Sequence, residues 1–149
     1  MKRFALFCAA VSVAAFADKP VHSAKGSGLI QFGPNREEIK VDAVLREVGG
    51  VTGKADVDDI SAGVRVRIDV NCLNVQGNVA TVSGIVTRSS DETRVPVGFE
   101  GIFQVVDGGD KATDFMSLAN FFEVGVGADC NAPGEFDLVP VQKGDIRVQ

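Results

Sequence analysis

Residues 64–72, Val-Arg-Val-Arg-Ile-Asp-Val-Asn-Cys (VRVRIDVNC), alternate strictly between apolar and polar side chains. Successive side chains of a β-strand point to opposite faces of a sheet, so this period of two predicts a strand with one face in a core and one in water. The alternation slips at Cys72-Leu73, where two apolar residues adjoin, and Val75 continues in the new phase. An extra residue in one strand shifts the phase in this way, so we expect a β-bulge there.

A second strand follows after a tight turn. Gln76-Gly77-Asn78 separates the first strand from Val79–Val86 (VATVSGIV). Gly and Asn tolerate the positive φ angles of tight hairpins, so the two strands are predicted to pair. Gly84 lies inside the second strand, where a missing side chain indicates a bend or the close approach of another main-chain segment.

The rest of the chain repeats this pattern of short apolar segments and turns. We expect further strands at Leu29–Phe32, Ile39–Leu45, Val51–Val57 and Val95–Val106, and a terminal hairpin of Phe136–Val141 and Asp145–Val148 around Lys143-Gly144. Asp114–Phe122 fits a helix or a strand equally well. The sequence therefore predicts an all-β protein: an antiparallel meander of about eight or nine strands closed as a small barrel, with a two-sheet β-sandwich as the alternative.

The first residues have the features of an export signal. Lys2 and Arg3 precede the apolar segment Phe4–Phe16, and Ala15-Phe16-Ala17 supplies the small residues that a signal peptidase reads. The apolar segment is shorter than the roughly 20 residues that cross a bilayer, and no later segment approaches that length, so no membrane span is expected.

These features divide the chain into three parts. We predict a signal peptide at residues 1–17, a flexible N-terminal segment at 18–27 and a single β domain at 28–149. Cleavage after Ala24 and a retained N-terminal anchor are the alternatives. The protein is then expected to be secreted or periplasmic.

The cysteine count changes when the signal is removed. Cys8 leaves with the signal, and Cys72 and Cys130 remain. An even pair in an exported chain predicts a disulfide bond, which in the chain-entropy model stabilises the fold by about 4 kcal/mol. The alternative is two buried thiols.

Composition and charge exclude several function classes. The net charge of −5 becomes about −7 once Lys2 and Arg3 are removed, so nucleic acid is not an expected partner. The chain has one histidine, His22, and no Trp or Tyr. One histidine rules out a zinc site with several His ligands, and a position close to the predicted cleavage point is unsuited to a Ser-His-Asp arrangement.

Residues 70–87, VNCLNVQGNVATVSGIVT, carry a recognisable pattern. It resembles a group of secreted, mostly bacterial β-proteins without an assigned function that share V-x-C-L-x-V-x-G-N-x-A-x-V-S-G-x-V. The later part of their pattern, V-x-D-x-G and a downstream Asp, matches residues 105–109 and Asp114, with Gly108 at a position where Asn is common. The resemblance implies export, an all-β fold and a hairpin at Gly77-Asn78, and it implies no reaction.

Acidic side chains supply the candidate sites. Asp107, Asp110 and Asp114 surround a Gly-rich turn, and a hard cation such as calcium prefers several oxygens from a flexible loop. The alternative is an ordinary solvated turn, because the spacing does not fit an EF-hand. Asp69 and Glu100 are expected to face solvent, which disfavours acid/base chemistry by two carboxylates.

Two functions remain open. The first is an exported, non-enzymatic β domain that acts as a binding or structural module for an unknown partner, with no cofactor other than the calcium considered above. The second is a barrel whose hydrophobic cavity binds or transforms a small apolar molecule. A core packed with the remaining phenylalanines and valines is the alternative to such a cavity.

Overall fold

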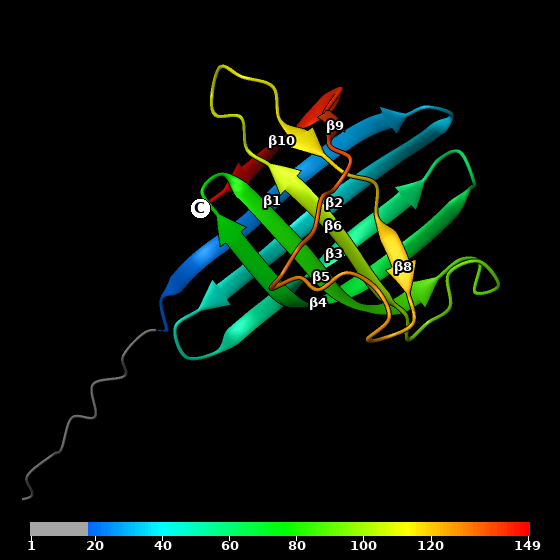
Figure 1. Ribbon diagram of the computed structural model, residues 1–149, viewed down its shortest axis with the longest axis horizontal. Helices are drawn as coiled ribbons and strands as arrows, with labels where there is room; N and C mark the ends of the chain where they lie inside the picture. Colours follow the sequence, from blue (N-terminus) through cyan, green and yellow to red (C-terminus); the bar gives the residue numbers. More distant parts are fainter. Residues whose placement is uncertain (1–17) are drawn as a thin grey trace, which may run out of the picture.

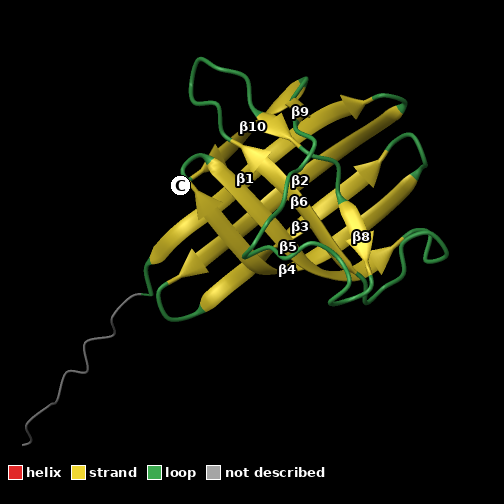
Figure 2. Ribbon diagram, in the orientation of Figure 1, coloured by secondary structure: helices red, strands yellow, loops and turns green. Residues whose placement is uncertain are grey.

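The computed structural model describes residues 18–149, and the predicted signal peptide lies outside the described residues. The described part is built from strands, turns and loops and contains no helix (Figure 2). The strands are β1 Pro20–Phe32, β2 Asn35–Arg46, β3 Gly50–Asp59, β4 Val64–Gln76, β5 Val79–Ser89, β6 Glu100–Val106, β7 Phe115–Met116, β8 Asn120–Phe122, β9 Val139–Pro140 and β10 Lys143–Val148.

All of these strands belong to one antiparallel sheet. Its order is β10-β1-β2-β3-β4-β5-β6-β7-β9, and β8 pairs with β6 beside β7 (Figure 1). The sheet is strongly curled into a half-barrel. The predicted all-β antiparallel meander is thus confirmed, whereas the two-sheet alternative is wrong because one ladder of hydrogen bonds runs through every strand of the described chain.

The strands β4 and β5 form the predicted hairpin. Gln76 pairs with Val79, which leaves a two-residue turn in which Gly77 has a φ of 62°. The register between β4 and β5 shifts between Val70 and Cys72, so the expected bulge forms just before the predicted position at Cys72-Leu73. A Cβ atom on Gly84 would collide with the carbonyl oxygen of Asp69, so this position needs glycine for the close approach of β4.

The concave side of the sheet holds the core. Alternate residues of the long strands point inward, as Ile39, Val41 and Ala43 do on β2. Phe103 on β6 and Ile68 on β4 have no exposed surface. These side chains are part of one continuous hydrophobic core.

The N-terminal segment is ordered, contrary to the prediction. Residues 18–27, expected to be flexible, mostly lie in β1, which pairs with β2 on one side and β10 on the other. Ala24 is fully buried between Ala43 and Val148. The segment is short and polar, and the prediction of flexibility followed from that composition. In the structure, hydrogen bonds to β2 and β10 on both sides hold the segment in place. A cut after Ala24 would remove the first part of β1.

One open alternative is resolved, and two local expectations need correction. Asp114–Phe122, for which helix and strand were equally open, contains the strands β7 and β8, and both pair with β6. The segment Val95–Phe99 is a turn, and the predicted strand begins only at Glu100. The predicted terminal hairpin does not form, because β9 pairs with β7 while β10 pairs with β1.

A long connection crosses the convex face of the sheet. Residues 123–138, here called the strap, run from β8 across β4–β6 to β9 (Figure 1). The Cys72–Cys130 disulfide fixes the strap to β4 with its Cα atoms 6.3 Å apart, which confirms the predicted bond. Asn74 Nδ2 also donates to the carbonyl oxygen of Cys130 at 3.0 Å. The strap thereby covers outward side chains of β5 and β6.

Candidate functional site: the strap groove

The strap encloses a groove of about 430 Å³ against the convex face of the sheet and the β1–β2 turn. We call it the strap groove. Its apolar lining comes from Phe32, Ile102, Leu118, Phe122 and Phe136, and its polar lining from Asn35, Ser117, Asn120, Glu135 and Asp137. Three phenylalanines from three separate segments therefore converge on one hollow.

Strand alternation places the floor of the groove. Gly101 and Phe103 of β6 face the core, so Ile102 points to the convex side. There Ile102 is only 1% exposed, because the strap and the residues before it cover it. The wall contains Ser117, whose Oγ accepts from Gln104 N at 2.9 Å and donates to Leu118 O at 3.1 Å. The hydroxyl of Ser117 is thus held by two main-chain groups.

A buried carboxylate supports the wall of the groove. Glu37 on β2 is 5% exposed, and its Oε1 accepts from the main-chain amide of Ala119 at 2.8 Å. Ala119 lies between Leu118 and Asn120, which both line the strap groove. Burial raises the pKa of Glu37 from 4.5 to about 7; the Ala119 amide opposes this rise, and the charge of Asp59 on β3 adds to it.

The sequence did carry a signal for Glu37. The side chain has the same phase as Ile39 and Val41, so the period of two places it on the core face. A charged residue in an inward phase is rare and indicates a special partner. Here the partner is a main-chain amide 82 residues away, which no local pattern reveals.

The three aspartates considered for calcium are engaged in other contacts. Asp107 accepts from Gly109 N at 2.8 Å through Oδ1 and from Val148 N at 3.0 Å through Oδ2. Asp114 likewise accepts from Gly108 N at 2.9 Å and from Ile146 N at 2.8 Å. Main-chain hydrogen bonds from Val148 and Gly109 lower the pKa of Asp107.

The third aspartate of the turn, Asp110, forms an ion pair with Arg147. Asp110 is exposed and lies 3.3 Å from Arg147. Within residues 18–149, no three His, Cys, Asp or Glu side chains are arranged to hold a metal ion. The carboxylates of Asp107 and Asp114 therefore fasten β10 to the loop between β6 and β7.

Three polar residues of the sequence pattern, Asn78, Asp107 and Asp114, belong to the same hydrogen-bond network. Asn78 Nδ2 donates to the carbonyl oxygen of Asp107 at 2.8 Å, and Asp107 N donates to Asn78 O at 3.0 Å. The Gly77-Asn78 turn, Asp107 and Asp114 thus form one chain of hydrogen bonds that ends on β10. In this structure the side chains of Asn78, Asp107 and Asp114 connect a hairpin, a loop and an edge strand.

A second hollow, of about 440 Å³, lies on the convex face of β2–β5. Its charged lining is Glu38, Lys40, Asp56, Asp58, Arg65, Arg67 and Arg88. Most of these charges already pair, as Arg67 does with Asp56 at 2.8 Å and Arg65 with Asp58 at 3.4 Å. This hollow has no aromatic lining, so it offers a small molecule less apolar contact than the strap groove does.

The other sequence candidates lie apart from the strap groove. His22 is on β1, where its Nδ1 lies 3.2 Å from the carbonyl oxygen of Gln149. Asp69 is exposed on β4 as expected, and Glu100 is half-buried on β6. Ile85 of β5 separates them in the sheet, so they do not form a carboxylate pair.

The chain matches no protein-family model, no curated protein and no solved structure. Across residues 18–149, no helix has the length and apolar character needed to cross a bilayer.

Proposed function

We propose that the chain is an exported, non-enzymatic binding module that holds a small amphipathic molecule in the strap groove. The observation that carries this proposal is a hollow of about 430 Å³ in which apolar side chains from β1, β6, β8 and the strap face one another beside a few polar groups. Sites for small molecules have this composition and volumes of about 300–1,000 Å³.

The binding site lies outside the sheet rather than inside it. Interior positions are filled by fully buried side chains such as Phe103, Ile68 and Ile39. A cavity in the barrel interior, the second function considered from the sequence, would need some of these side chains to move. The strap groove needs no such movement.

Export is supported by two independent features. The first residues have the sequence features that predict a signal peptide, and the Cys72–Cys130 disulfide suits an oxidising compartment. The same disulfide anchors the strap that forms one wall of the strap groove, so the groove depends on the compartment in which the bond persists.

The groups that line the strap groove favour binding over catalysis. The lining contains no His, Cys or Lys that could act as a base or nucleophile near neutral pH. Ser117 is held by main-chain groups, as described above, and has no basic side chain beside it in the lining. The polar groups are suited to orienting a ligand.

The curled sheet is proposed to act as a barrel whose seam is closed without a strand ladder. Val141 N donates to Asp114 O at 2.9 Å and Gln142 N donates to Leu29 O at 2.8 Å, so this short segment bridges the two edges. The carboxylates of Asp107 and Asp114 complete the seam. A barrel closed in this way gives the strap groove a rigid floor.

Binding can be tested with a neutral apolar dye, N-phenyl-1-naphthylamine, because a chain without Trp or Tyr gives little fluorescence background. We expect saturable binding that Phe136→Ala weakens about tenfold, since a truncated ring loses apolar contact. Phe115→Ala is the matched control, because Phe115 is 36% exposed and lies outside the groove lining. Equal dye affinity in both variants would overturn the proposal.

A further inference from the structure

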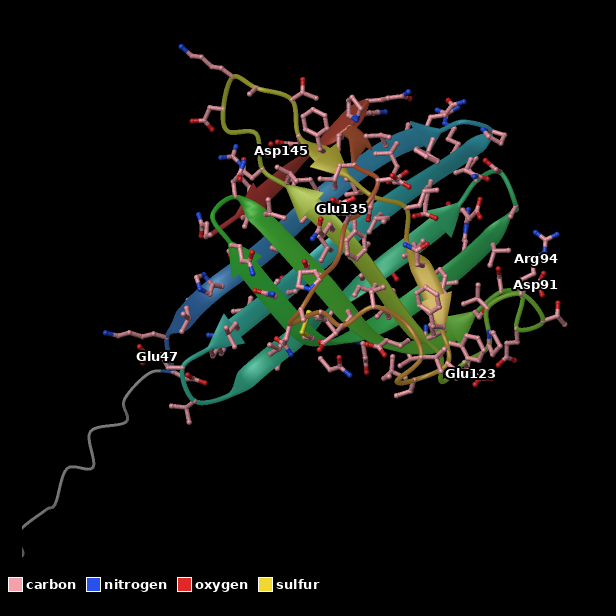
Figure 3. The ribbon with its side chains drawn as sticks, viewed as in Figure 1. Glu47, Asp91, Arg94, Glu123, Glu135 and Asp145 are labelled. Atoms are coloured by element: carbon pink, nitrogen blue, oxygen red, sulfur yellow. A yellow bond between two sulfur atoms is a disulfide. The ribbon has the colours of Figure 1, made fainter. Side chains whose placement is uncertain are left out.

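The charged residues of the strap groove all have the same sign. Glu135 and Asp137 are the ionisable side chains of its lining, and the lining contains no Lys, Arg or His. Both are exposed and flank Phe136 on the strap. Figure 3 shows Glu135 on the strap, in front of the sheet.

These two carboxylates have no counter-charge of their own. Elsewhere in residues 18–149 acidic side chains form ion pairs, as Asp56 does with Arg67 and Asp58 with Arg65, but neither Glu135 nor Asp137 takes part in one. A positive charge entering the strap groove would therefore meet two unpaired carboxylates, and a negative charge would be repelled by both.

The aromatic lining favours the same sign of charge. Phe32, Phe122 and Phe136 each retain exposed or half-exposed surface in the groove. The face of an aromatic ring is negative and attracts cations, particularly those that carry several methyl groups and are weakly hydrated. Apolar side chains, aromatic rings and carboxylates thus line one hollow.

We propose that the strap groove selects organic cations with an apolar tail, of which alkyl-trimethylammonium ions are the simplest example. This inference rests on the proposed function and specifies the chemical class of its ligand. The tail packs against the half-buried side chain of Leu118, and the positive head lies among the phenylalanine rings and beside the carboxylates of Glu135 and Asp137.

The inference is tested with three probes that share one tail and differ in charge: octyltrimethylammonium, 1-octanol and octanoate. Each competes with bound N-phenyl-1-naphthylamine at low salt, with the two ions below their micelle concentrations and the alcohol below its solubility limit. We expect the cation to displace the dye at a concentration about tenfold lower than the alcohol, and the anion to be the weakest. Equal displacement by all three probes overturns the charge preference while leaving binding in the groove intact.

A charge-matched pair of variants locates the effect. The double variant Glu135→Gln with Asp137→Asn is expected to bring the cation within about twofold of the alcohol, with the alcohol unchanged. The control is Glu92→Gln with Glu123→Gln, which removes the same net charge from exposed residues outside the groove lining. If the control loses the preference as fully as the groove variant does, the preference comes from net charge and the proposal fails.

Two outcomes separate this inference from the proposed function. Dye binding that Phe136→Ala leaves unchanged shows that the strap groove is not a binding site, and both proposals then fall. Dye binding that is lost in Phe136→Ala but shows no discrimination among the three probes removes only the cation inference. A preference that shrinks as salt is added supports it, because exposed carboxylates are screened by salt.

Discussion

The carboxylate of Glu37 on β2 accepts a hydrogen bond from the main-chain amide of Ala119, 82 residues further along the chain, at 2.8 Å. This contact joins the inward face of a long strand to the segment that forms one wall of the strap groove. The amide gains an acceptor in a place with little water, and the carboxylate loses most of its hydration. The stability of this region therefore depends on whether Glu37 is charged.

The pH dependence of stability follows from that burial. The pKa of Glu37 rises from 4.5 to about 7 on folding, so the folded protein keeps a proton that the unfolded chain releases in this interval. The contribution of Glu37 to the free energy of unfolding is fully present below pH 4.5 and is lost as the pH rises through 7, in total by about 3 kcal/mol.

Replacing Glu37 by Gln tests this relation. The amide oxygen of Gln can still accept from Ala119 N but carries no charge, so Glu37→Gln should gain about 3 kcal/mol relative to the wild type between pH 4.5 and pH 8. Urea unfolding across this range measures the difference. Glu38→Gln, at an outward position 3.7 Å from Lys40, is the control and should show no such trend. A difference between Glu37→Gln and wild type that stays constant with pH contradicts the prediction.

Loss of Asp114 should weaken the attachment of β10. In Asp114→Ala the amides of Gly108 and Ile146 lose their acceptor, and we expect the free energy of unfolding to fall by about 2–4 kcal/mol. Asp110→Ala removes an exposed ion pair with Arg147 and should change it by less than about 1 kcal/mol. Chemical denaturation of both variants gives the comparison, and equal losses would show that β10 is held by other contacts.

Removal of the disulfide should lower both the stability of the fold and the affinity for the dye. Replacing Cys72 and Cys130 by Ala removes a link across 58 positions of sequence, which in the chain-entropy model costs about 4 kcal/mol of stability. Dye binding should weaken as well, because the strap is no longer fixed to β4. Thermal unfolding and dye titration measure the two effects.

The protein with residues 18–149 should also show no titratable thiol when denatured without a reductant, and finding two thiols would contradict the bond.

Gly84 provides a test of the packing between β4 and β5. A methyl group there would collide with the main chain of β4 at Asp69, so Gly84→Ala should destabilise the fold by about 1–3 kcal/mol. Gly134→Ala is the matched control, because nothing lies within 4 Å of a Cβ atom at that position. Its effect should stay within about 0.5 kcal/mol. Similar denaturation midpoints for the two variants would mean that β4 can move away.

The predictable part of this fold is the part in which pattern and pairing are local. The alternation in residues 64–72 and the Gly77-Asn78 turn involve neighbouring residues, so the hairpin and its bulge were predictable. The pairing of β10 with β1 joins the two ends of the described chain, and no local pattern specifies it. A Gly turn at Lys143-Gly144 therefore suggested a hairpin that the longer-range pairing overrides.

The strap groove could not be predicted from the sequence for a similar reason. Residues 123–138 have no strand or helix period, and their path is set by the bond from Cys130 to Cys72 and by the pairing of β8 and β9 with other strands. The disulfide itself was predictable from cysteine count. The convergence of Phe32, Phe122 and Phe136 was not, because each ring reaches the groove from a different segment.

The network around β10 also occupies main-chain groups at the edge of the sheet. A strand at the end of a sheet normally presents free amides and carbonyls on which another chain can add as a further strand. On β10 the amides of Ile146 and Val148 are already bonded to the carboxylates of Asp114 and Asp107. Two aspartates that resemble cation ligands in the sequence therefore occupy amides that a strand from another molecule would need. This opposes the intermolecular addition of strands to β10.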